Sequence, residues 1–141
     1  MEIKAIPAQL TWKVRHKAMW PNKPFSYIKL DNDVEGQHFG LYLENKLVSV
    51  ISVFIIGKEA QFRKFATVPQ HQGNGYGSNL LSYIFKEMSE FGIKRLWCNA
   101  RQDKTLYYKK FGMIKTPITF TKGNIDYIIM ESHLELQKRN S

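Results

Sequence analysis

Cysteine, acidic residues and long apolar runs are all scarce in this chain of 141 residues. The single cysteine, Cys98, cannot form an internal disulfide, and the polar start of the sequence has no signal-peptide pattern, so we expect a reducing, cytoplasmic compartment. The longest apolar run, Leu47 to Ile56, is about half of the roughly 20 residues that a membrane span requires. We therefore expect no membrane partner. Histidines and Cys98 do not fall at ligand spacing, so no metal site is predicted.

Acidic residues are fewer than basic ones in this chain. The chain has 21 Lys and Arg against 12 Asp and Glu, a formal net charge of +9. A basic protein attracts anions, which suits a phosphate-bearing cofactor and a nucleic acid equally well. The aromatic residues fall mainly in apolar strand or helix patterns, so nucleic acid is the less favoured partner. With 43% hydrophobic residues, we expect one globular domain spanning residues 1–141.

The apolar periodicities predict an α/β fold in which a mixed, mostly antiparallel sheet carries helices on both faces. The expected elements are strand 1–6, helix 7–19, an extended piece 25–30, a turn 31–33, strands 38–44, 47–56 and 60–68, a helix ending before Gly92, strand 93–99, helix 103–111 and a hairpin of 115–121 with 125–133. In the first helix, Leu10 and Val14 begin an apolar stripe, and Arg15 to Lys17 are expected on the solvent side. Cys98, inside a strand-like run, is expected to be buried.

The most informative segment is Val68 to Ser78, which joins a predicted strand to a long amphipathic helix. Its glycines, at positions 73, 75 and 77, allow tight backbone turns. The start of the following helix carries roughly half a positive charge, so the joint suits a phosphate or pyrophosphate. The glycine spacing does not fit a dinucleotide-binding fingerprint, and the absence of a Gly-Lys pair excludes a Walker loop.

The run Gln72 to Gly77 resembles the Gln/Arg-x-x-Gly-x-Gly/Ala signature of the GNAT superfamily of N-acetyltransferases. Further along, Leu106 to Met113 is similar to the family segment Phe-Tyr-x-Lys-x-Gly-Phe, with Tyr108 on the family's tyrosine and Met113 in place of the usual phenylalanine. The expected element order is also that of the family. Residues 14–17, 20–25 and 96–101 look like those of a small bacterial branch of uncharacterised members.

The resemblance implies an acetyl-CoA-dependent N-acetyltransferase that transfers the acetyl group directly to a primary amine. It implies that Tyr108 protonates the departing thiolate and that the backbone N–H of Val68 polarises the thioester carbonyl. The residues it implies for cofactor binding are Ala66, Thr67, Val68, Gln72, Gly73, Asn74, Gly75, Tyr76, Gly77, Ser78 and Asn99. Asn99 is expected to end its strand beside the helix that carries Tyr108.

Several alternatives stay open. The general base could be His38, His71, Glu35, Glu59 or a chain of water molecules. The acceptor is a small-molecule or peptide amine whose identity the sequence does not give, and many small family members form homodimers. The alternative function is a non-catalytic module that binds acyl-CoA or, through its basic charge, nucleic acid.

Overall fold

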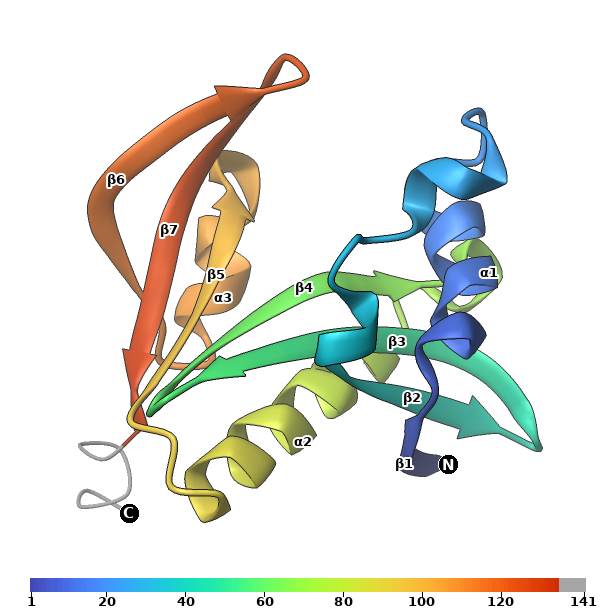
Figure 1. The fold of residues 1–141 in the computed structure, drawn as a ribbon, viewed down its shortest axis with the longest axis horizontal. Coiled ribbons are helices and arrows are strands. Elements are labelled where there is room, and N and C mark those ends of the chain that lie inside the picture. The colour runs from blue at the N-terminus through green and yellow to red at the C-terminus, as the bar shows by residue number, and fades with distance from the viewer. Residues whose placement is uncertain (135–141) are drawn as a thin grey trace. The chain divides into compact units, whose positions relative to one another are not determined.

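The computed structural model describes residues 1–134, which form a mixed α/β fold built on a seven-stranded sheet (Figure 1). The chain divides into two compact units. Unit 1 comprises Met1–Phe54 and Phe62–Ile84, and unit 2 comprises Ile55–Gln61 and the chain from Phe85 onward. Within the described part of the chain, no helix combines the length and apolar character that a membrane crossing requires.

The strands are hydrogen-bonded in the order β1-β2-β3-β4-β5-β7-β6. Their bounds are β1 Glu2–Ile6, β2 Gln37–Leu43, β3 Lys46–Ile56, β4 Glu59–Thr67, β5 Arg95–Arg101, β6 Ile114–Lys122 and β7 Ile125–His133. The helices are α1 Ala8–Met19, α2 Tyr76–Glu90 and α3 Thr105–Lys109, with short 3-10 turns η1 Phe25–Ile28, η2 Asp33–Glu35, η3 Pro69–His71 and η4 Gln102–Lys104. Strands β4 and β5 pair in parallel, whereas β1–β2, β2–β3, β5–β7 and β6–β7 are antiparallel. The predicted mixed, mostly antiparallel sheet is confirmed.

In unit 1 the two faces of the sheet are covered by different helices. His38 and Phe39 are neighbours on β2, so their side chains point to opposite faces. His38 contacts Ser52 on the face where α1 packs, whereas the ring of Phe39 meets that of Tyr83 on α2 at 5.9 Å. Strand β3 lies between these layers and is buried from Val48 to Val53, as its two-sided apolar pattern predicted.

In unit 2 the strands are tied by polar contacts and covered on one side by helix. Arg95 on β5 bonds Glu59 on β4 and Glu131 on β7, each at 2.6 Å. On the opposite side of β5, Cys98 is buried as predicted. Phe85 of α2 stacks on Phe111, which follows α3, at 6.0 Å.

Two local predictions were wrong. Residues 25–30 do not extend; they begin with the 3-10 turn η1, because Pro24 sets the backbone for a turn and the N–H of Tyr27 bonds the Pro24 carbonyl at 2.9 Å. On α1, Val14 is buried and Lys17 is exposed as predicted, but two of its residues were assigned to the wrong face. Leu10 is 47% exposed and Arg15 is fully buried, because an internal carboxylate pairs with the guanidinium.

Candidate active site

The glycine loop of unit 1 has the backbone conformation that only glycine adopts at low cost. Gly73 and Gly75 both have φ of +82°, in the left-handed region. A Cβ at either position would meet no atom within 4 Å, so the backbone here faces open space. Helix α2 begins directly after, and the N–H of Asn79 donates the first helical hydrogen bond to Gly75 at 3.0 Å. The N–H groups of the first turn have no partner four residues earlier within the helix.

Gly77 serves a different purpose, which is close packing of α2 on β4. A Cβ at this position would lie 3.2 Å from Oγ1 of Thr67 and 3.3 Å from the ring of Phe65. The Thr67 hydroxyl is in turn 2.9 Å from the hydroxyl of Ser49 on β3, which also donates to the Ala66 carbonyl at 3.1 Å. Ser49 is a site residue that we did not predict. The feature of the sequence that could have identified Ser49 is a hydroxyl side chain within the otherwise apolar run of β3.

The loop between β4 and α2 is held by its own side chains. Gln72 donates from Nε2 to the carbonyl of Thr67 at 2.9 Å. Asn74 reaches back to the carbonyls of His71 and Gln72, each at 3.4 Å. The ring of Tyr76 meets the edge of the His71 ring at 6.1 Å. In this conformation the side-chain amides of Gln72 and Asn74 bond the loop's own carbonyls. The groups of the loop that can bind an anion are then its backbone N–H groups.

The Val68 N–H, which the resemblance assigned to the thioester carbonyl, is bonded within the sheet. Val68 is buried, and its N–H donates to the carbonyl of Val48 on β3 at 2.9 Å. Sheet formation therefore uses the donor that the resemblance assigned to the thioester carbonyl. The carbonyl of Val68 is also bonded, to the N–H of His71 at 3.0 Å.

The chain around the loop suits an anion. No Asp or Glu occurs between Glu59 and Glu87, and the first turn of α2 holds no acidic residue. Ser78, in that first turn, is half-buried. An exposed, left-handed glycine backbone at the start of a 15-residue helix matches the geometry by which proteins hold phosphate groups. These residues therefore fit a phosphate or pyrophosphate group.

Unit 2 carries Tyr108, on α3. Burial raises the pKa of its phenol above the ordinary value, and the nearby Cys98 and Tyr107 raise it further. Burial alone raises the pKa of the Cys98 thiol to about 12. Both groups stay protonated at neutral pH. The phenol can therefore donate a proton, whereas the thiol is no candidate nucleophile, because only a thiolate attacks.

The expected position of Asn99 was wrong in one respect. Strand β5 continues to Arg101, so Asn99 lies inside the strand instead of ending it. It is exposed between Cys98 and Ala100, which are both buried. Since side chains alternate along a strand, Asn99 points to the face opposite that of Cys98.

His38 fails as the general base. It is 4% exposed, and both ring nitrogens are engaged, Nδ1 with the Ser52 hydroxyl and Nε2 with the Asp33 carbonyl, each at 2.7 Å. Glu59 is exposed but bonds Arg95 at 2.6 Å. Glu35 is exposed on η2, and His71 is half-buried on η3. His71, Glu35 and a water chain remain the open alternatives.

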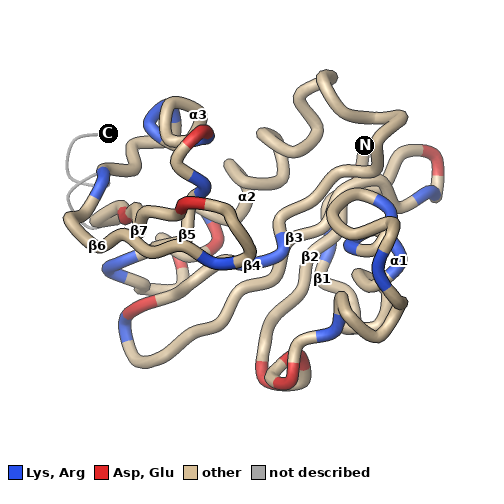
Figure 2. Tube along the Cα trace, turned by 90° about the horizontal axis from the view of Figure 1, so that it is seen from above, with Lys and Arg blue, Asp and Glu red and all other residues tan. Residues whose placement is uncertain are grey.

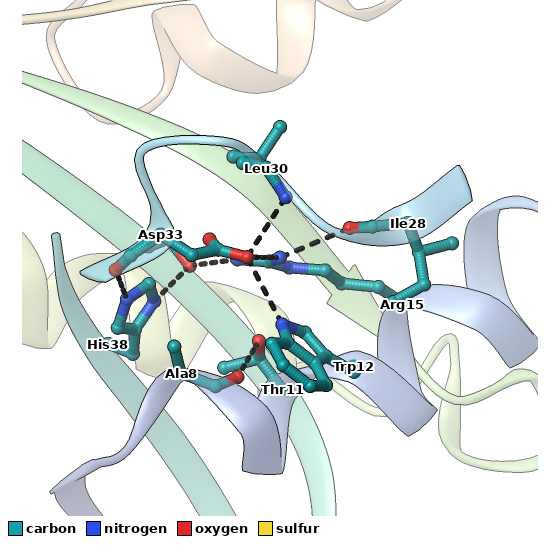
Figure 3. Close-up of polar contacts among 9 residues, drawn as sticks. Ala8, Thr11, Trp12, Arg15, Ile28, Leu30, Asp33 and His38 are labelled. Atoms are coloured by element: carbon teal, nitrogen blue, oxygen red, sulfur yellow. Dashed lines mark hydrogen bonds and ion pairs between the residues drawn. The ribbon is translucent and has the colours of Figure 1, made fainter. Parts of the chain in front are cut away.

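A buried polar cluster in unit 1 was not predicted (Figure 3). Arg15 from α1 donates to both carboxylate oxygens of Asp33, each at 2.9 Å, and to the Ser52 hydroxyl at 2.8 Å. The indole of Trp12 donates to the same carboxylate at 3.1 Å. Burial pushes the pKa of Asp33 upward, but the hydrogen bonds from Arg15, the Leu30 N–H and Trp12 hold it below the ordinary value. The signal in the sequence was Ser52, a hydroxyl in the apolar run of β3.

The comparison with known families points to one of them. The sequence model described as "Acetyltransferase (GNAT) family" matches residues 7–113, a range that contains both the glycine loop and Tyr108.

Three known proteins illustrate the similarity. The chain is 27% identical over 121 residues to the uncharacterized N-acetyltransferase YitI of Bacillus subtilis, covering 79% of this chain and 81% of that protein. It is 26% identical over 99 residues to the [ribosomal protein bS18]-alanine N-acetyltransferase of Haemophilus influenzae, covering 67% and 68%. The PaiA N-acetyltransferase of Thermoplasma acidophilum, solved in complex with coenzyme A, shares the fold with a TM-score of 0.70 at 18% identity, covering 94% of this chain and 99% of that one.

Proposed function

The chain belongs to the acetyltransferase (GNAT) family, and we propose that it binds acetyl-CoA through the loop Gln72–Ser78 and uses Tyr108 as the acid for the departing thiol. The observation that carries the cofactor site is the pair of left-handed glycines, Gly73 and Gly75, exposed directly before α2. Their N–H groups and the start of the helix would hold the pyrophosphate. The complex of PaiA with coenzyme A supports the same ligand for this chain.

When bound, acetyl-CoA supplies an acetyl group activated as a thioester. The amine nitrogen of the acceptor attacks the carbonyl carbon, a C–N bond forms and the C–S bond breaks. Tyr108 would give its phenolic proton to the sulfur. The attacking nitrogen would lose one proton to solvent and Tyr108 would regain one from solvent, so that the products are the amide and the free thiol. The raised pKa of Tyr108 keeps that proton on the phenol at neutral pH, and it also makes the phenol a weaker acid than an ordinary tyrosine.

The acceptor that suits these residues best is a peptide α-amine. Of the side chains considered as a general base, His38 and Glu59 are engaged by other groups. An α-amine, with a pKa near 7.7–8.0, is roughly one-third neutral at pH 7.5, whereas a lysine amine near 10.4 is only about 0.1% neutral. An α-amine therefore needs no strong base. The Haemophilus relative, named for an alanine of ribosomal protein bS18, supports this class of acceptor.

The test is thiol release from acetyl-CoA in the presence of four acceptors. These are a short peptide with a free α-amine, the same peptide with an acetylated N-terminus, an N-blocked peptide with one lysine, and spermidine. We expect the free α-amine to give the fastest release and the fully blocked peptide to give none above the acceptor-free rate. Faster release with the lysine peptide or spermidine would overturn the acceptor class, and equal release with the blocked peptide would overturn direct transfer to an amine.

A further inference from the structure

The N-terminal part of unit 1 is basic and contains no acid over a long stretch. Between Glu2 and Asp31 the sequence has six Lys or Arg residues and no Asp or Glu. Figure 2 shows the same bias on α1, where blue segments occur and red ones do not. One of the six cations, Arg15, is neutralised internally by Asp33. The charge that faces outward comes from lysines.

Aromatic rings are exposed on the segment that follows α1. Phe25 is 42% exposed and Tyr27 is 51% exposed. The ring of Tyr27 meets that of Trp20 edge-on at 5.3 Å, and the ring of Phe25 meets that of His16 at 5.5 Å. Exposed apolar side chains that gather in one patch, unlike ones scattered singly, mark candidate sites of contact with a partner.

Lysine ammonium groups lie over these rings. Lys29 Nζ is 4.4 Å from the centre of the Trp12 ring and 5.9 Å from that of Phe25, and Lys23 Nζ is 5.4 Å from that of Tyr27. Neither lysine has an acidic partner among residues 1–134. We call this set the aromatic–lysine surface; it comprises Trp12, Trp20, Lys23, Phe25, Tyr27 and Lys29.

The buried cluster beneath fixes the segment that carries this surface (Figure 3). Arg15 donates to the carbonyl of Ile28 at 3.2 Å, next to Lys29. Trp12 is held by its indole N–H, bonded to Asp33 at 3.1 Å. His16 bonds the carbonyl of Lys23 at 2.7 Å. The backbone that presents the rings and lysines is thus ordered before any partner arrives, which lowers the entropy cost of binding.

We propose that the aromatic–lysine surface binds single-stranded nucleic acid. Exposed rings offer stacking platforms for bases, and neighbouring ammonium groups neutralise phosphates, which is how sequence-tolerant single-strand binding works. A duplex would engage only the lysines, because its bases are already stacked. An acidic peptide would likewise contact the lysines but would have no bases to stack on the aromatic rings. Nucleic acid was disfavoured from the sequence because the aromatic residues mainly followed apolar patterns, and Phe25 and Tyr27 are exposed exceptions to that trend.

The test is fluorescence anisotropy with a labelled 12-nucleotide single-stranded RNA, its DNA counterpart and the matched duplex, without acetyl-CoA or acceptor. One variant removes rings, Phe25→Ala with Tyr27→Ala, and its control is Phe91→Ala, which removes a ring that is 67% exposed elsewhere. A second variant removes charge, Lys23→Gln with Lys29→Gln, and its control is Lys115→Gln with Lys122→Gln, at two exposed positions on β6. Circular dichroism checks that each variant is folded.

We expect the protein to prefer single strands over the duplex and the ring variant to lose about tenfold or more in affinity, since each stacked base contributes about 1–3 kcal/mol. The Lys23/Lys29 variant should lower the slope of log affinity against log salt by roughly 1.4 for two lost phosphate contacts. The control variants should leave both quantities at their wild-type values. A stronger response to RNA than to DNA would identify the RNA as the source of the ligand, and the reverse would identify DNA. Equal losses in test and control variants, binding of the duplex as tight as the single strand, or no binding at low salt would each overturn the proposal.

Discussion

Arg15 and Asp33 form a two-pronged ion pair inside unit 1, with both nitrogen–oxygen distances at 2.9 Å. Arg15 is fully buried and Asp33 is 5% exposed. The pair joins α1 to the turn that precedes β2, segments 18 positions apart in the sequence. Removing one partner would leave the other charge buried without compensation.

Asp33→Asn is therefore expected to lower the free energy of unfolding by about 3–5 kcal/mol, the usual cost of breaking a buried pair from one side. Urea denaturation followed by tryptophan fluorescence measures it. The matched control is Asp31→Asn, an exposed carboxylate two residues away, which we expect to stay within about 0.5 kcal/mol of wild type. Equal effects from the two substitutions would mean that the ion pair contributes little.

The same pair makes stability depend on pH. Because the folded-state pKa of Asp33 is lowered, the carboxylate contributes stability that is fully present above its unfolded pKa, near 3.9. That contribution is lost as the pH falls through the folded pKa. The stability difference between wild type and Asp33→Asn should hence be constant from pH 7 to 5 and shrink below about pH 4. Comparing the two proteins cancels the contributions to stability of other acids, such as Glu131, because these acids titrate in both. If the stability difference between wild type and Asp33→Asn grew on acidification, the pKa of Asp33 would be raised in the folded state, contrary to this account.

Cys98 is predicted to resist thiol reagents in the folded protein. It is 2% exposed and burial raises its pKa to about 12, so little thiolate exists at pH 8. With Ellman's reagent we expect no reaction under native conditions and one thiol per chain in guanidinium chloride. Fast native labelling would show that β5 opens readily, and would contradict the packing described here.

Tyr108→Phe should lower kcat by about 10²–10⁴-fold, the usual contribution of a general acid, while acetyl-CoA affinity stays at the wild-type level. Because the pKa of Tyr108 is raised, wild-type kcat should show no fall from phenol ionisation near pH 10, the ordinary tyrosine value. The neighbouring Tyr107→Phe serves as control and should keep kcat. Matching kcat values for Tyr108→Phe and wild type would reduce Tyr108 to a packing residue.

The fold was largely predictable because its signals are local. The two-sided apolar run of β3, the glycine that ends α2 and the turn at Gly123 each specify an element without reference to the rest of the chain. The wrong predictions concern residues whose burial depends on a partner that is distant in the sequence. Arg15 is buried only because Asp33 is there to pair with it, and no periodicity within α1 contains that information.

The candidate site also has a part that the sequence predicts and a part that depends on distant contacts. The glycine loop was recognisable because its chemistry is a backbone pattern, and glycine allows the left-handed φ of Gly73 and Gly75 at low cost. The hydrogen bond from Val68 to Val48 was not predictable, since it depends on how far the β3–β4 pairing extends. Likewise, the engagement of both His38 nitrogens depends on Ser52 and Asp33, which the sequence alone did not bring together.

The most direct test of the acetyl-CoA site is calorimetric titration of wild type, Gly75→Ala and Gly57→Ala with acetyl-CoA. Gly75 and Gly57 both have positive φ, +82° and +63°, and both face open space, so alanine meets a left-handed backbone and no clash at each, but Gly57 lies in the β3–β4 turn. We predict that wild type and Gly57→Ala bind with the same affinity and that Gly75→Ala binds about tenfold more weakly, because strain of about 1–3 kcal/mol falls on the loop that holds the pyrophosphate. No binding by wild type at about 1 mM acetyl-CoA, or equal affinities for all three proteins, would contradict the account.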